Sequence, residues 1–383
     1  GPAGLSAAHD LAKAGYEVTV YDAAQQAGGM LIRGIPTFRL PREVVAQEVG
    51  LMEDFGVNFQ LGEYIGPKQM EELLQTYDAV LVATGMTKAK KLNLEGWELE
   101  GIYSALEYMD RVNYDQDLYR HPGQQFVEHG DVVGIHRDAA AADNDHIAVC
   151  VECGDEVPAH DWELKEAKEE GVVLMEGWMP VSYIGEQPRL DGVKLIQVES
   201  IQKVDQKINC VTIPGTEKVI KADLVIEAIG QKADPVWKEY QGNPKVYYAG
   251  DVQSGDVSVV NAMAAGKKAA LDIDNALRGR TLKDPLRLRT ISPAPINEKI
   301  YPAVRLKEKQ YPTPVVPVAE RILNFDEVEL VMNELEAIAE VNRCLECGYQ
   351  FVDPEKCIGC GVCVRVCPVG GVIHMKPVAE EER

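Results

Sequence analysis

The sequence is poor in long hydrophobic runs and in positive charge, and both shortages limit what the protein can contact. No apolar stretch approaches the roughly 18 residues of a membrane-spanning helix, so we expect no membrane partner. Lysine and arginine number 39 against 61 acidic residues, which gives a net charge of -22 at pH 7. A surface of this sign repels phosphate backbones, so nucleic acid is not an expected partner either.

Secretory features and histidine-based metal motifs are also missing. No signal peptide is visible in the sequence, and we expect a cytoplasmic protein in a reducing compartment, where disulfides are rare. The seven histidines show neither an i, i+4 pair nor an H-E-x-x-H motif, which disfavours a histidine metal site. What remains is a chain of 383 residues, 46% of them hydrophobic, which is enough for about two to three domains.

Cysteine is concentrated near the end of the chain. The run from Cys357 to Pro368 has the spacing C-x2-C-x2-C-x3-C-P, which is typical of ferredoxin-type [4Fe–4S] sites. Thiolates two residues apart can surround one cubane, and Gly359 and Gly361 let the backbone turn around it. Two further cysteines stand shortly before this run. The predicted metal ligands are therefore Cys344, Cys347, Cys357, Cys360, Cys363 and Cys367.

The number of clusters stays open at this point, because two all-cysteine clusters need eight thiolates and the segment holds six. Cys367 either completes the cluster of the three preceding cysteines or joins Cys344 and Cys347 around a second one. Gln350 and Asp353 lie where a missing ligand would stand, and a partner subunit is another source. One [4Fe–4S] cluster is predicted, with a second as the alternative.

The beginning of the chain has the pattern of a dinucleotide-binding unit. Gly1 and Gly4 are spaced like the last two glycines of G-x-G-x-x-G, and small and apolar residues follow to Gly15 as an expected helix. A strand over residues 16–21 then ends at Asp22. Helix N-terminal amides bind a pyrophosphate, and the acid accepts from a ribose hydroxyl. The competing interpretation is an ordinary βα turn without a ligand.

Several further motifs give the chain a specific resemblance. They are Gly-Gly-Met-Leu at 28–31, Gly-Ile-Pro at 34–36, Phe-Arg-Leu-Pro at 38–41, Ala-Thr-Gly at 83–85, Tyr-Tyr-Ala-Gly-Asp at 247–251 and the helix of small residues at 259–266. With them the chain resembles the flavoproteins of the glutamate synthase small subunit type, which are similar to adrenodoxin reductase and of the pyridine nucleotide-disulfide oxidoreductase type. Residues 38–40 are interpreted either as flavin contacts or as packing.

The resemblance implies an α/β fold with an FAD-binding Rossmann-like domain interrupted by an NAD(P)-binding one. The FAD domain is expected at 1–112 and 233–280, the insert at 113–232, a proline-rich linker at 281–320 and a helix with the iron–sulfur module at 321–383. Asn324 is expected to cap that helix. The predicted cofactor-binding residues are Gly1, Ala3, Gly4, Asp22, Gly29, Met30, Leu31, Ile35, Pro36, Ile65, Ala83, Thr84, Gly85, Gly250, Asp251 and Val259.

The insert departs from the family pattern. Only eleven residues, 136–146, separate its first two strand-like runs, and no G-x-G-x-x-G follows the first of them. A βαβ crossover needs about that length for a minimal helix, so we expect a clipped crossover and a weakened nucleotide site. Glu152 stands near the position where NADPH-reading relatives carry arginine, and an acid there favours NAD over NADP by charge repulsion. Cys150 and Cys153 point to opposite faces of a strand, which disfavours a redox pair.

The sequence predicts an FAD and iron–sulfur electron-transfer subunit of a multi-subunit oxidoreductase, which links [4Fe–4S] clusters with NAD(H). A 2-oxoacid:acceptor or an aldehyde oxidoreductase complex is the example that we consider for the parent enzyme. The expected partners are other iron–sulfur subunits or a ferredoxin, and no catalytic acid, base or nucleophile is predicted. The alternatives are a flavin and iron–sulfur relay whose insert is only a scaffold, an NADPH-oxidising subunit of the glutamate synthase type, and a relic without cofactors.

Overall fold

The computed structural model describes residues 1–114, 132–136, 146–157, 159–204, 207–255, 258–281, 311–322 and 324–342, with residues 132–136 described by their backbone alone. The chain divides into two compact units. The first comprises Gly1–Leu282 with Val315–Glu329, and the second comprises Lys283–Pro314 with Leu330–Arg383. Both expected segments of the FAD domain and the insert therefore belong to the first unit.

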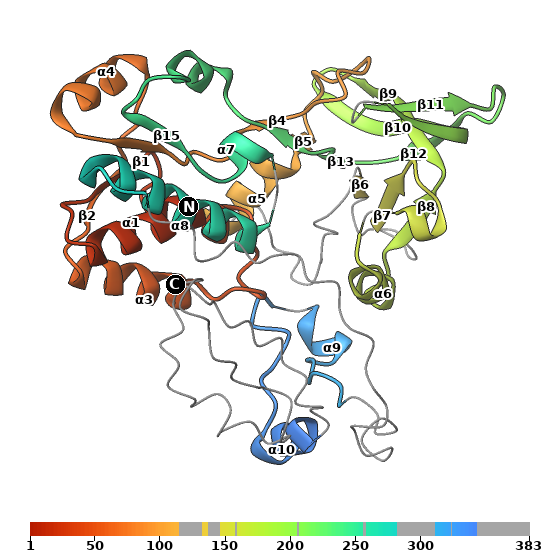
Figure 1. The fold of residues 1–383 in the computed structure, drawn as a ribbon. Coiled ribbons are helices and arrows are strands. Elements are labelled where there is room, and N and C mark those ends of the chain that lie inside the picture. The colour runs from red at the N-terminus through yellow and green to blue at the C-terminus, as the bar shows by residue number, and fades with distance from the viewer. Residues whose placement is uncertain are drawn as a thin grey trace, which may run out of the picture. The chain divides into compact units, whose positions relative to one another are not determined.

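Two small parallel sheets and two long helices form the part of the first unit that begins at Gly1 (Figure 1). Strand β1 (Thr19–Asp22) pairs with β2 (Asn58–Leu61), and β3 (Val80–Val82) pairs with β15 (Val246–Tyr248). Helix α1 (Pro2–Lys13) packs along α8 (Val259–Arg278) through small residues. Four further helices complete this part: α2 (Met30–Arg33), α3 (Arg42–Asp54), α4 (Pro67–Thr76) and α7 (Asp251–Ser254).

The close contact of α1 with α8 depends on glycine. A Cβ at Gly266 would lie 2.1 Å from the carbonyl oxygen of Ala3, a distance that no real side chain tolerates. The two helices therefore touch through their backbones, as the alanine- and glycine-rich sequence of α8 allows. A second core lies on the other side of the sheets, where Met70, Val82, Trp237, Tyr240 and Val246 pack together. Two of these residues belong to the 3-10 helix η3 (Pro235–Tyr240).

The insert combines a five-stranded sheet with a long antiparallel ribbon. The sheet has the order β5-β13-β6-β7-β8, and the ribbon pairs β10 with β9, β11 and β12. Its apolar core includes Leu190, Val193, Leu195 and Val225, each with at most 1% of its surface exposed. The sheet includes β5 (Ile102–Ser104), which with most of α5 (Ala105–Tyr114) precedes the expected start of the insert at residue 113. The elements that follow are β6 (Val132–His136), β7 (His146–Cys150), η2 (Gly154–Glu156), α6 (Asp161–Glu169), β8 (Val173–Glu176), β9 (Trp178–Glu186), β10 (Arg189–Val204), β11 (Lys207–Thr212), β12 (Lys218–Lys221) and β13 (Leu224–Ala228).

Strand β6 runs against its neighbours. It pairs antiparallel with both β7 and β13, with His136 opposite His146 at one end. A Rossmann-like unit joins its first two strands in parallel through a crossover helix, and an antiparallel pair needs only a short connection. The short connection that the sequence predicts between the first two strands of the insert is therefore found together with an antiparallel orientation of β6.

A narrow antiparallel ribbon connects the insert with the rest of the first unit. It consists of β4 (Lys88–Ala89) and β14 (Gln231–Lys232), which precede β5 and follow β13 in sequence. The N–H of Lys90 also donates to the carbonyl of Gly230 at 3.0 Å. The chain thus enters and leaves the insert side by side.

The helix expected from Asn324 begins nine residues later than the sequence predicts. Residues 324–330 are extended, and the Asn324 carboxamide only accepts from the N–H of Asp326 at 3.0 Å. Helix α10 (Glu334–Asn342) is capped by Asn333, whose side chain accepts from the N–H of Glu336 at 3.0 Å. The prediction was wrong because Val328 forms backbone hydrogen bonds with Val316 and with Phe38, at 3.0 and 3.1 Å, and these hold the segment extended.

Candidate functional site

The predicted glycines of the N-terminal motif meet at the start of helix α1. A Cβ at Gly29 would lie 2.7 Å from the Cα of Gly1, so the two backbones are in direct contact. Gly28 and Gly29 have φ values of 139° and 56°, which side chains strongly disfavour. These glycines have no side chain to cover the N-terminus of α1, and the macrodipole of α1 adds a positive potential at the same point.

Three other predicted residues lie around the first turn of α1. A Cβ at Gly4 would be 3.5 Å from the Cβ of Ala83, which follows β3. A Cβ at Gly250 would be 2.9 Å from the Cβ of Ala3, and Gly250 has a φ of 74°. The segments at 1–4, 28–30, 83–85 and 250–251 are therefore brought to one place by the fold.

Asp22 occupies the last position of β1, as the sequence predicts. One carboxylate oxygen accepts from the N–H of Ala24 at 3.0 Å, and the other lies 4.0 Å from the nitrogen of Gly1. About a quarter of the side chain is exposed (24%), so an oxygen of this carboxylate can accept from a hydroxyl group placed at the start of α1. The predicted acid and the predicted glycines thus belong to one site.

The flavin-facing candidates Met30, Leu31, Ile35 and Pro36 lie on α2 and on the turn after it. This turn is tight, because the N–H groups of Gly34 and Ile35 both donate to the carbonyl of Met30, at 3.1 and 3.0 Å. Phe38 and Arg39 come next, and the structure assigns them to packing. Phe38 stacks on Phe325 with ring centroids 6.2 Å apart, and Arg39 lies over the ring of Trp162 at 4.7 Å.

The remaining candidates are distributed around these segments. Thr84 and Gly85 follow β3, and a Cβ at Gly85 would meet nothing within 4 Å. Asp251 begins α7 rather than ending a strand, and Val259 is the first residue of α8, which is capped by Ser258. Ile65 is partly buried and packs against the core of Met70 and Val82.

This arrangement has the chemical features of an FAD-binding site. Glycine backbones that touch each other, the N-terminus of a twelve-residue helix and an acid at a strand end are the features that a dinucleotide requires. Gly28 and Gly266 were not predicted as site residues, although both are needed for the close approaches. The adjacent glycine pair at 28–29 was the available signal for the first, and the small-residue pattern of α8 was the signal for the second.

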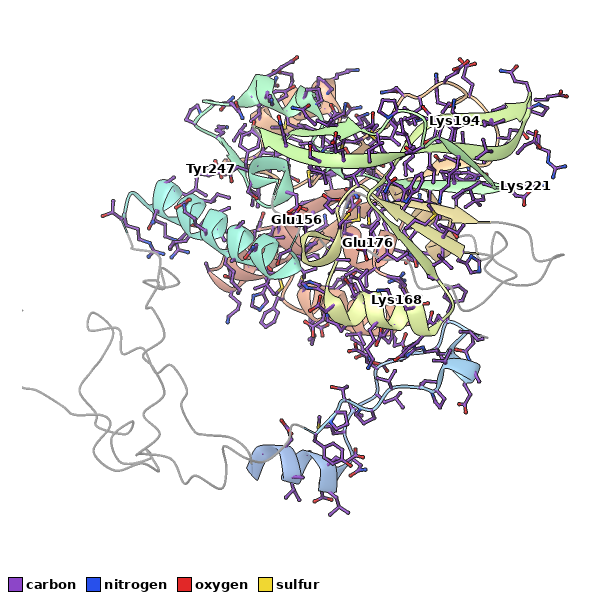
Figure 2. The ribbon with its side chains drawn as sticks, turned by 90° about the vertical axis from the view of Figure 1, so that its right-hand side faces the viewer. Glu156, Lys168, Glu176, Lys194, Lys221 and Tyr247 are labelled. Atoms are coloured by element: carbon purple, nitrogen blue, oxygen red, sulfur yellow. The ribbon has the colours of Figure 1, made fainter. Side chains whose placement is uncertain are left out.

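The corresponding edge of the insert lacks such a cradle in the part that the structure describes. Glu152, which follows β7, is only 1% exposed, so its side chain does not lie on the surface of the insert. The expectation that an acid at Glu152 favours NAD over NADP stays a prediction. The turn after it is held by Glu176, labelled in Figure 2, whose carboxylate accepts from the N–H of Gly154 at 2.7 Å.

Cys150 and Cys153 do not form a redox pair. Cys150 is buried and Cys153 is exposed, and neither is part of a disulfide. Burial raises the pKa of the Cys150 thiol to about 12, so the thiol stays protonated at neutral pH. A protonated, buried thiol is a poor nucleophile, in agreement with the sequence prediction.

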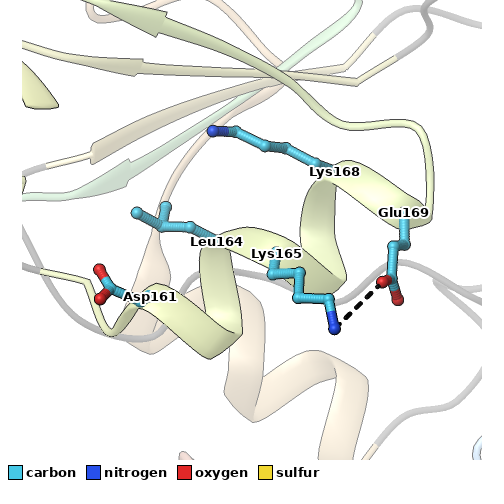
Figure 3. A pocket seen from close by; sticks show the side chains of 5 residues that line it. All are labelled: Asp161, Leu164, Lys165, Lys168 and Glu169. Atoms are coloured by element: carbon cyan, nitrogen blue, oxygen red, sulfur yellow. Dashed lines mark ion pairs between the residues drawn. The ribbon is translucent and has the colours of Figure 1, made fainter.

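A hollow lies beside α6 (Figure 3). It is lined by Asp161, Leu164, Lys165, Lys168 and Glu169. The Lys165 ammonium lies 3.7 Å from the Glu169 carboxylate. No predicted site residue borders this hollow, and its charged side chains compensate one another, so we do not assign a ligand to it.

The six predicted cysteine ligands lie outside the described residues, so their arrangement is not part of the structure. Within the described part, no group of three or more histidine, cysteine or acidic residues is placed to hold a metal ion. No helix found there combines the length and the apolar character needed to span a membrane.

Two family descriptions match the chain. That of the pyridine nucleotide-disulphide oxidoreductases matches residues 1–266, and that of the 4Fe-4S binding domain matches residues 351–372. The second range contains Cys357, Cys360, Cys363 and Cys367, and it leaves out Cys344 and Cys347. The first range contains every predicted cofactor-binding residue.

Two curated relatives are similar to large parts of the chain. The chain is 30% identical over 379 residues to the NADP(+)-dependent formate dehydrogenase subunit beta of Moorella thermoacetica, covering 91% of this chain and 53% of that protein. It is 30% identical over 308 residues to the glutamate synthase [NADPH] small chain of Halomonas elongata, covering 70% of this chain and 65% of that protein. The chain thus spans between about half and two thirds of the length of these relatives.

Among solved structures, FprA from Mycobacterium tuberculosis has a similar fold. The TM-score is 0.57 at 14% identity, and the match covers 73% of this chain and 83% of FprA. At this identity the likeness concerns the fold alone. It agrees with the α/β architecture of two Rossmann-like domains that the sequence predicts.

Proposed function

Because the chain belongs to the pyridine nucleotide-disulphide oxidoreductase family and carries a 4Fe-4S binding domain, we propose that it is an electron-transfer subunit of a larger oxidoreductase. It passes electrons between a nicotinamide nucleotide and [4Fe–4S] clusters by way of FAD. Bound FAD supplies the chemistry, since a flavin exchanges two electrons with a nicotinamide and single electrons with iron–sulfur. The protein contributes binding, orientation and electrostatics.

The contact between Gly1 and Gly29 at the N-terminus of α1 is the observation that carries this proposal. A Cβ on Gly29 would come within 2.7 Å of Gly1, so a side chain at this position would displace the backbone that borders the cradle. In the proposed complex the α1 amides bind the pyrophosphate and Asp22 accepts from a ribose hydroxyl. Asp251 and the N-terminus of α8 then border the flavin end, where helix amides favour negative charge.

The parent complex and the partners are proposed from the relatives. The match to the formate dehydrogenase subunit beta covers 91% of the chain, which favours a formate-oxidising complex over a 2-oxoacid or an aldehyde oxidoreductase. The expected partners are the other iron–sulfur subunits of that complex, with a ferredoxin as the soluble alternative. We propose Cys357, Cys360 and Cys363 as ligands of one cluster, and Cys344, Cys347 and Cys367 as ligands whose distribution over one or two clusters is to be measured.

A second function is favoured by the reversed strand β6. In a Rossmann-like unit the phosphate-binding turn follows the first strand, which corresponds to β6. Because β6 pairs antiparallel with β7, the carboxyl ends of these two strands point in opposite directions. In this second function the insert serves as a scaffold, and electrons enter and leave the flavin only through the clusters.

Anaerobic stopped-flow spectroscopy of the purified holoprotein separates the two functions. We expect the flavin absorbance to bleach with NADH or NADPH, and we expect Cys357→Ser to keep this bleaching while it blocks reduction by dithionite-reduced ferredoxin. Bleaching through ferredoxin alone, with both nucleotides inert, would establish the relay instead. A colourless protein that takes up neither FAD nor iron on reconstitution would rule out both.

A further inference from the structure

Arg42 holds together the turn that carries the flavin-facing candidates. It is the first residue of α3, and its guanidinium donates to three backbone carbonyls of the preceding segment. One nitrogen lies 2.9 Å from the carbonyl oxygen of Leu31 and 3.4 Å from that of Leu40. The other lies 2.8 Å from the carbonyl oxygen of Ile35. Both ends and the middle of the segment 31–40 are thereby tied to one side chain.

These carbonyls need a partner that the local backbone does not provide. Helix α2 has a single turn, and the last carbonyls of any helix lack an intrahelical donor. The carbonyl of Met30 already accepts from Gly34 and Ile35, at 3.1 and 3.0 Å. The guanidinium of Arg42 supplies donors for the carbonyls of Leu31 and Ile35, which lie one helical turn apart.

An arginine is otherwise disfavoured at this position of α3. The N-terminus of a helix is the positive end of its dipole, so a cation at the first residue is repelled. The neighbouring arginines of the same segment pair with acids, Arg33 with Asp110 at 2.7 Å and Arg39 with Glu163 at 3.3 Å. Arg42 donates to main-chain carbonyls, and its planar fork matches several of them in a way that a lysine ammonium does not.

We propose that Arg42 is a positioning residue for the flavin: it fixes the main chain at Leu31 and Ile35 in the conformation that contacts the isoalloxazine. The proposal rests on the proposed function, which places these two residues at FAD. Arg42 itself acts through the turn, since its donors point to the carbonyls of residues 31, 35 and 40. A turn without this arginine has unsatisfied carbonyls and more than one accessible conformation.

The test compares Arg42→Ala and Arg42→Lys with wild type and with Arg111→Ala. Arg111 is a matched control because it lies 42% exposed on α5, where it pairs with Glu107 at 2.9 Å. FAD affinity of the apoprotein is measured by quenching of flavin fluorescence, and amide hydrogen exchange of residues 31–40 is measured on the same apoprotein. We expect R42A to weaken FAD binding by about tenfold and to speed exchange in this segment. R42K recovers only part of both, and R111A changes neither.

The readouts separate this proposal from the proposed function. If R42A binds FAD as tightly as wild type and its residues 31–40 exchange at the wild-type rate, the positioning role is wrong, although the proposed FAD binding is not affected. Failure of the wild-type apoprotein to bind FAD would overturn the proposed function, and the positioning role with it. If R42A does not fold, R42K decides the question, because it keeps the charge and removes the planar fork. Full recovery of affinity and protection in R42K would then contradict the proposal.

Discussion

At the scale of single residues, the Asp274 carboxylate links the end of α8 to the residues that follow α1. It is 7% exposed on α8 and accepts from the Tyr16 hydroxyl at 3.0 Å. It also pairs with Arg280 and, at 3.1 Å, with Arg278. The hydrogen bond from Arg280 is the main cause that holds the pKa of this carboxyl below its usual range. The loop after α1 is thus tied to the end of α8.

Asp274→Asn is expected to lower the free energy of unfolding by about 1–3 kcal/mol at neutral pH, because two arginines lose their charged partner. A lowered pKa in the folded state gives stability that is present above the unfolded pKa near about 3.9 and is lost as pH falls through the folded pKa. The difference between wild type and the variant should therefore shrink below about pH 4.

Urea unfolding between pH 3 and pH 7 measures this difference. Asp272→Asn is the control on the same helix, since Asp272 pairs with Lys268 at an exposed position and should change stability by about 0.5 kcal/mol at most. A D274N variant as stable as D272N at pH 7 would contradict the assignment of Asp274.

At the scale of elements, the contact of α1 with α8 decides where the N-terminus of α1 lies. Gly266→Ala places a methyl group 2.1 Å from the carbonyl oxygen of Ala3, so the two helices must move apart. We expect a loss of about 2–4 kcal/mol of stability, together with weaker FAD binding at the displaced helix start. Thermal unfolding and FAD titration measure the two effects.

Gly50→Ala provides the matched control for this change. Gly50 lies inside α3, and a Cβ there would meet nothing within 4 Å. Alanine is a better helix former than glycine, so G50A should raise stability by up to about 1 kcal/mol. Replacing glycine by alanine is thus expected to lower the stability of the protein in α8 and to raise it in α3. Equal effects of G266A and G50A would show that α1 and α8 are not in backbone contact.

At the scale of the whole molecule, the first unit is held together where three distant segments meet. Residues 37–39, helix α6 and residues 315–329 come together there. Arg321 is 5% exposed, and its Nε lies 2.6 Å from the Glu170 carboxylate. Val328 donates to the carbonyl of Phe38 at 3.1 Å, and Thr37 donates to the carbonyl of Phe325 at 3.4 Å. The segment that leads toward the cysteines therefore packs on residues 37–38 and on the end of α6.

Arg321→Ala is expected to cost about 3 kcal/mol, because it leaves the Glu170 carboxylate buried without its cation. Limited proteolysis should cleave residues 315–329 faster in this variant, and thermal unfolding should occur at a lower temperature. Arg189→Ala is the control, since Arg189 is 75% exposed and pairs with Asp223 at 3.3 Å, where little stability is at stake. Unchanged protection of the segment in R321A would show that the ion pair does not hold it.

The sequence by itself determined the parts of the site that depend on local backbone freedom. Glycine spacing at Gly1, Gly4 and Gly29 and the acid at Asp22 predicted a dinucleotide site, because positive φ and close backbone approach are properties of the residue type. The cysteine spacing predicted a 4Fe-4S domain, which the family match at residues 351–372 confirms. Such signals are short in range and do not need the fold to be recognised.

Only the tertiary structure decided the features that depend on contacts between distant segments. The amphipathic pattern after Asn324 suggested a helix, but backbone hydrogen bonds from Val328 to Phe38 and from Val316 to Val328 keep the segment extended. The direction of β6 depends on its two neighbours, and the turn of residues 31–40 depends on the reach of Arg42. A sequence pattern indicates which residues are apolar and which are flexible. Which donor or acceptor forms a hydrogen bond with a buried polar group depends on how distant segments pack.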